Sequence, residues 1–179
     1  KEGRIYRNAE YEFAGVDKAS SVAAIYSGSN PHVNGIVANA WLDRNTLQVV
    51  NCVDDTGVMG IYTSESTSPV RLKVSNLSDE LMIATQGKAE VYSIAPTREM
   101  AVLAAGHASK GAFWINDETG KWSGTTYYEN FPKWVSNYND RQGLDFRIGE
   151  MTWGPYLPVT AYKYLTTETK QVTFKHKFD

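Results

Sequence analysis

Short helix patterns, each bounded by residues that start and stop a helix, alternate with strand patterns along this chain. In the first pattern, Asp17 is a good N-cap residue ahead of an apolar stripe, and Gly28 opens the segment that ends the helix. Two further helices are expected over 77–86 and within 97–105. Their start and stop residues are Ser75 or Ser78, Gly87 in the C′ position, Pro96 in the first turn, and Gly106. Helices interleaved with strands in this way favour an α/β fold.

Alternating apolar and polar residues predict strands over 4–13, 46–53 and 171–178. The last of these has no obvious partner. A short buried strand is expected over 89–95. Segments 112–115 and 122–128, on either side of a turn at 117–120, favour a β-hairpin, which we expect beside the sheet.

The remaining segments have weaker signals. Segments 32–44 and 54–69 have loop composition, and the Asn34–Gly35 pair in the first favours a turn. Residues 131–138 have amphipathic helical spacing, and 139–158 are irregular.

Composition sets broad limits on the function. The 179 residues are 42% apolar, which is enough to bury one core, and the formal net charge is −2. No run of Lys or Arg exceeds a pair, and no stretch of about 18 apolar residues occurs, so we expect no nucleic-acid partner and no membrane span.

Cys52 is the single cysteine, which excludes an intrachain disulfide and a multi-cysteine zinc site. Because the chain begins with Lys1 rather than Met, we expect that a targeting segment has been removed.

Metal ligands are sparse in the sequence. The three histidines, His32, His107 and His176, lie far apart in the sequence. His107 is either a hydrogen-bonded structural residue or a ligand. His176 is either a residue on the solvated face of a strand or a ligand. The Asp54–Asp55 pair could bind a hard cation through oxygen or could solvate a turn. No metal site is assigned to the chain.

Other catalytic signals are weak or absent. A serine near a lysine, as in Lys18 and Ser20, is too common to indicate an activated nucleophile. The chain has no nucleophile-elbow, P-loop or dinucleotide-binding glycine motif. The aromatic residues of the 113–138 segment could stack sugars or bases, or could pack a core. They include Trp114, Trp122, Tyr127, Tyr128, Trp134 and Tyr138.

Longer segments resemble a known family. The segment IYSGSNPHVNGIVANAWLDR (25–44) resembles the one that follows the nucleophile in type I phosphodiesterases/nucleotide pyrophosphatases, a family of the alkaline phosphatase superfamily. NCVDD (51–55), LSDEL (77–81), VLAAGHASKGAFWINDETGKW (102–122) and TYYENFPKWVSNYN (126–139) look like the phosphate-irrepressible bacterial alkaline phosphatases of that family. The resemblance extends through nearly the whole chain, and the order and spacing of its segments carry it.

This resemblance implies a two-zinc hydrolase in which a Thr or Ser attacks phosphorus. The nucleophile position falls on Lys18, and Ser20 could serve only with a register shift of two residues. Asn39 matches an asparagine that hydrogen-bonds a phosphoryl oxygen, although its amide could instead satisfy the backbone of a tight loop. The basic pair that clamps the phosphoryl group corresponds to Thr97 and Glu99. Arg98 lies between them and is the second substrate-binding candidate.

By this resemblance the chain is a partial α/β layer of a phosphatase-like fold with an added hairpin or cap region. We expect residues 1–111 to belong to the core and 112–179 to a cap-like segment of one incomplete domain. No zinc is expected in the chain, and no hydrolysis by the chain alone. The longer protein of which the chain would be a part, called the parent below, would act on a phosphate ester in the periplasm or outside the cell. The alternative is a degenerate family member that binds a glycan or a nucleotide. Exposed apolar surface could also support a homodimer.

Overall fold

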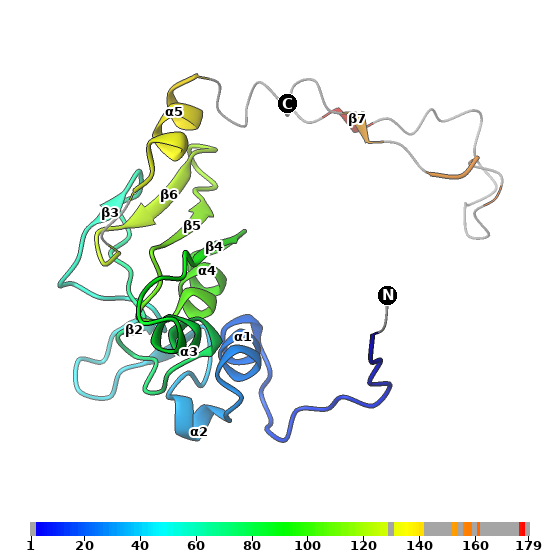
Figure 1. The fold of residues 1–179 in the computed structure, drawn as a ribbon, viewed down its shortest axis with the longest axis vertical. Coiled ribbons are helices and arrows are strands. Elements are labelled where there is room, and N and C mark those ends of the chain that lie inside the picture. The colour runs from blue at the N-terminus through cyan, green and yellow to red at the C-terminus, as the bar shows by residue number, and fades with distance from the viewer. Residues whose placement is uncertain are drawn as a thin grey trace.

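The computed structural model describes residues 3–128, 131–141, 152–153, 156–158, 161 and 176–177. Its centre is a four-stranded sheet in the order β3 (Gly60–Ile61), β6 (Trp122–Thr125), β5 (Gly111–Ile115) and β4 (Tyr92–Ala95) (Figure 1). β4 and β5 are parallel, whereas β6 is antiparallel to both β5 and β3. It follows that β3, β4 and β5 run in the same direction and end at the same edge of the sheet.

Helix α4 (Arg98–Ala105) connects the two parallel strands and packs on both of them, and α1 (Lys18–Ser27) packs on α4. This strand–helix–strand unit confirms the predicted α/β class. Pro96 precedes the N-cap residue, Thr97, instead of lying in the first turn, and Gly106 ends the helix as expected.

The predicted first helix is confirmed at both ends. Asp17 caps α1, and its carboxylate and the Ser20 side chain form a reciprocal capping box. Gly28 ends the helix in the left-handed region, with φ of 64°. The expected turn at Asn34–Gly35 is the end of a short helix, α2 (Pro31–Asn34).

The predicted caps of the helix near residue 77 were wrong in detail. Helix α3 (Leu77–Ala84) is capped by Asn76, which lies between the two serines that we proposed. At its end Gln86 has φ of 53° and occupies the C′ position, while Gly87 follows it and donates its N–H to the Met82 carbonyl. Asn76 is the N-cap residue instead of either serine because it is buried and its amide also donates to the Leu103 carbonyl of α4.

Several predicted strands are shorter than expected or absent. Residues 4–13, all of them described, form an exposed segment without a strand. The 46–53 strand shrinks to β2 (Val49–Asn51), which pairs with β1 (Ala40–Leu42) inside the segment predicted to be a loop. β4 lies at the edge of the sheet, so its side chains are only partly buried.

The predicted hairpin is confirmed as β5–β6, but it belongs to the sheet and does not lie beside it. The predicted boundary between residues 111 and 112 therefore falls inside β5, and the division into core and cap stays a prediction. The helix expected over 131–138 is α5 (Lys133–Arg141). The last predicted strand, 171–178, is described only at β8 (His176–Lys177), and its other residues lie outside the described part of the chain. β8 pairs with β7 (Thr152–Trp153) in an antiparallel arrangement.

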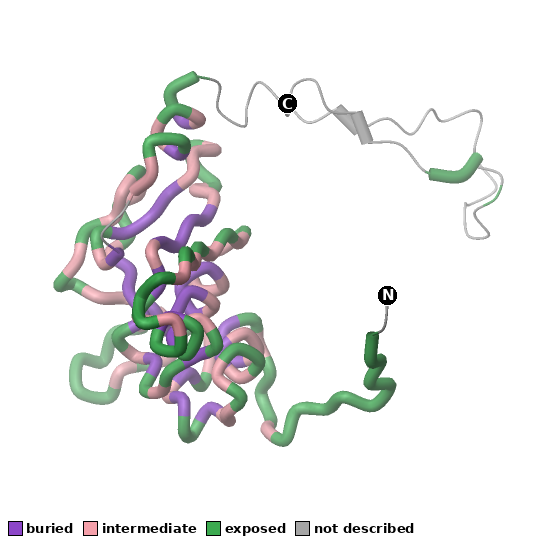
Figure 2. Tube along the Cα trace, viewed as in Figure 1, coloured by how far each residue is buried: buried purple, intermediate pink, exposed green. Residues whose placement is uncertain are grey.

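The core, whose residues are among those drawn as buried in Figure 2, extends from β5 of the sheet through α4 to α1. Trp114 belongs to it, while Phe113, the next residue back along β5, faces the other side of the sheet and meets Phe131 and Trp134 edge to face. Core packing is therefore the role of the buried aromatic residues of this segment, Phe113, Trp114 and Tyr128.

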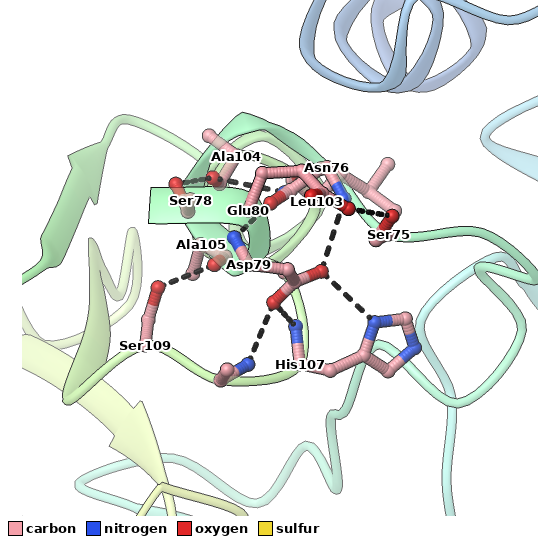
Figure 3. Close-up of polar contacts among 12 residues, drawn as sticks. Ser75, Asn76, Ser78, Asp79, Glu80, Leu103, Ala104, Ala105, His107 and Ser109 are labelled. Atoms are coloured by element: carbon pink, nitrogen blue, oxygen red, sulfur yellow. Dashed lines mark hydrogen bonds and ion pairs between the residues drawn. The ribbon is translucent and has the colours of Figure 1, made fainter. Parts of the chain in front are cut away.

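The buried carboxylate of Asp79 joins α3 to the loop after α4 (Figure 3). One of its oxygens accepts hydrogen bonds from the backbone N–H groups of His107 and Ala108, both at 2.7 Å. The other oxygen accepts from the Asn76 N–H at 3.0 Å and lies 3.3 Å from Nδ1 of His107. Since the Asn76 N–H is buried and the two loop hydrogen bonds are partly buried, the loop after α4 depends on this carboxylate.

We predict that Asp79→Asn destabilises the chain by about 1–3 kcal/mol, because an amide that replaces one oxygen leaves buried N–H donors without an acceptor. Urea unfolding followed by circular dichroism would measure the loss. Asp140→Asn, an exposed change of the same kind on α5, is the control. Equal unfolding midpoints for the two variants would contradict the role of Asp79.

A second prediction concerns Cys52, which has no exposed surface. Burial raises the pKa of its thiol to about 12, and the charge of Glu99 adds to the effect. We expect the native chain to react with iodoacetamide at pH 8 at least ~100-fold more slowly than the urea-unfolded chain, because the thiolate is the nucleophile. The control is Cys52→Ser combined with Asn45→Cys, which moves the thiol to an exposed loop. Rapid labelling of native Cys52 would contradict the prediction.

Candidate functional site

Polar side chains from three parts of the fold meet around Cys52, and we call this cluster the polar junction. It comprises Asp17, Asn39, Asn51, Asp54, Arg98 and Glu99. They come from the start of α1, the segments that flank β1 and β2, and the start of α4. The Cys52 N–H donates to the Asn39 carbonyl at 2.8 Å, and the charges of Asp17, Asp54, Arg98 and Glu99 all act on the Cys52 thiol.

At the start of α1, Asp17 and Asn39 hold each other and the helix. The Asn39 N–H donates to Oδ2 of Asp17 at 2.6 Å, and Oδ1 of Asn39 accepts from the Ala19 N–H at 2.9 Å. The other Asp17 oxygen accepts from the Ser20 N–H at 2.9 Å. The N–H groups of Ala19 and Ser20 in the first turn of α1, which would otherwise attract an anion, are therefore paired within the chain.

The hydrogen bonds to Asp17 favour the ionised form of its carboxyl. Burial raises the pKa of its carboxyl, but the hydrogen bonds from Ser20 and Asn39 outweigh that effect and leave the pKa below its usual value. The contribution of Asp17 to stability is thus complete above the ordinary aspartate pKa and is lost as the pH falls through the lowered value.

The two candidate nucleophile positions differ in their surroundings. Lys18 is exposed at the first position of α1, whereas Ser20 is buried one turn in. The Ser20 hydroxyl donates to Oδ1 of Asp17 at 3.0 Å and accepts from the Asp17 N–H at 3.0 Å. Its oxygen is therefore engaged in the helix cap.

Arg98 is surrounded by acceptors. Its Nη1 lies 2.8 Å from Asp54 Oδ1, and its Nε lies 3.3 Å from Glu65 Oε1 and 3.7 Å from Glu99 Oε1. The side chain is only 13% exposed. Glu99 also accepts from the Asn51 amide at 2.6 Å. The guanidinium charge of Arg98 is thus shared among three carboxylates.

The candidate metal ligands do not converge. Asp54 accepts from Arg98 and from the Asn51 N–H, while Asp55 accepts from the Ser68 hydroxyl, which lowers the pKa of Asp55. His107 contacts Asp79, away from both. Among the residues that the structure describes, no group of three or more His, Cys, Asp or Glu side chains could hold a metal ion. The donors in this part of the chain therefore do not fit the two-zinc centre that the resemblance implies.

A cleft of about 460 Å³ adjoins the polar junction at the carboxyl ends of β3, β4 and β5, and sequence reasoning missed it. Residues 63–65, 96–99 and 114–118 line it. Two of the lining residues, Thr97 and Trp114, have polar atoms, Oγ1 and Nε1, that are buried without hydrogen-bond partners. Ligand sites in α/β proteins gather at this edge of the sheet. The available signal was the set of polar residues that directly follow the predicted strands at 89–95 and 112–115.

No helix among the described residues is long and apolar enough to cross a membrane.

Comparisons with known proteins agree with the fold and with the resemblance. Residues 2–176 match the family of type I phosphodiesterases / nucleotide pyrophosphatases. The chain is 35% identical to alkaline phosphatase PhoV of Synechococcus elongatus over 86% of its own length and 29% of that protein. It is 30% identical to alkaline phosphatase PafA of Elizabethkingia meningoseptica over 89% of its length and 30% of the relative.

The crystal structure of wild-type alkaline phosphatase PafA superposes with a TM-score of 0.75 at 31% identity, over 82% of this chain and 29% of that one. The chain thus spans less than a third of the length of these relatives. By sequence and by fold, it belongs to the type I phosphodiesterase / nucleotide pyrophosphatase family of the alkaline phosphatase superfamily.

Proposed function

We propose that this chain is a piece of a phosphoester hydrolase-type protein and that it does not hydrolyse phosphate esters by itself. One observation carries the proposal. The residue that resemblance aligns with the family nucleophile is Lys18, at the first position of α1, and the N–H groups beside it are already paired with Asp17 and Asn39.

The chemistry of these groups supports the proposal. A lysine ammonium cannot form the phosphoester intermediate, and its charge would oppose bound divalent zinc. A phosphoryl group approaching the start of α1 would also meet the ionised carboxylate of Asp17, whose pKa is lowered. Asn39 remains our candidate for a remnant of the substrate pocket, although in this chain its Oδ1 accepts from the Ala19 N–H.

We extend the proposal to the parent protein through its relatives. PhoV and PafA are named alkaline phosphatases, and we propose that the parent acts on, or descends from proteins that act on, a phosphate ester outside the cytoplasm. In that parent, we expect the zinc ligands outside the residues of this chain that the structure describes.

The second candidate is a degenerate family member that serves as a binding or scaffold module. The cleft beside the polar junction favours it, because Glu65, Glu99, Asp117 and Glu118 line the cleft against the single cation of Arg98. Such a surface disfavours nucleotides and leaves a glycan as the better ligand. Two zinc ions bound per chain of the full-length parent, with turnover of p-nitrophenyl phosphate or its phosphodiester analogue, would exclude this candidate.

For the isolated chain, we predict no hydrolysis of either p-nitrophenyl substrate above background, with or without added Zn²⁺. Release of p-nitrophenolate is the measurement, and the alkaline phosphatase PafA is the positive control. Lys18→Thr should not restore turnover, because the hydroxyl group alone brings no metal ligands. Turnover that is abolished by Lys18→Ala or Ser20→Ala would overturn the proposal.

We also predict that the isolated chain forms a homodimer through exposed apolar surface. Tyr92 and Ile94 of β4 are both exposed, on a strand at the edge of the described sheet. Sedimentation velocity over a range of concentrations should show a dimer, which Ile94→Lys weakens more than the control Val37→Lys, an exposed position away from the sheet. A monomer at every concentration would contradict the prediction.

A further inference from the structure

We draw no further inference here: the strongest candidate, the free edge of strand β4 with its exposed Tyr92 and Ile94 side chains, belongs to the dimer surface proposed above, and nothing in the described part of the chain shows another partner for it.

Discussion

The fold depends on pairing the backbone N–H groups that helices and loops leave unpaired inside the chain. Asp17 and Asn39 do this at the start of α1, and Asn39 also accepts the Cys52 N–H through its carbonyl oxygen at 2.8 Å. Asp79 does it for the loop after α4. Each of these side chains joins segments that are distant in sequence, since a buried donor without an acceptor is costly.

The same pairing has a consequence for chemistry. In an anion-binding helix start, free N–H groups face the ligand. Here a carboxylate of the chain itself takes that place, with a pKa held below its usual value. Arg98 is likewise committed to Asp54, Glu65 and Glu99. Asp17, Asn39 and Arg98 are therefore engaged within the fold, which supports the proposal that the chain alone is inactive.

Local sequence signals predicted the helices well because their caps are local interactions. The capping box of Asp17 and Ser20 and the left-handed Gly28 lie within or next to the helix that they bound. Asn76 was harder to identify, because two serines nearby are also good caps. Its capping box with Asp79 is a local signal that we missed, and its contact with the Leu103 carbonyl of α4 is a tertiary one. The strands were predicted less well. An alternating pattern indicates which residues share a face, but a partner strand decides whether a ladder forms, and residues 4–13 have none.

By itself the sequence determined the α/β class, the position of most helices and the family, and it predicted that Lys18 occupies the nucleophile position. It also identified Asn39 and Arg98 as candidates, although their roles in binding stay predictions. Only the tertiary structure decided that Arg98 meets three carboxylates and that the ends of β3, β4 and β5 enclose an acidic cleft. The physical reason is that caps and turns depend on neighbours a few residues away, whereas a site depends on which distant segments the sheet brings to one edge.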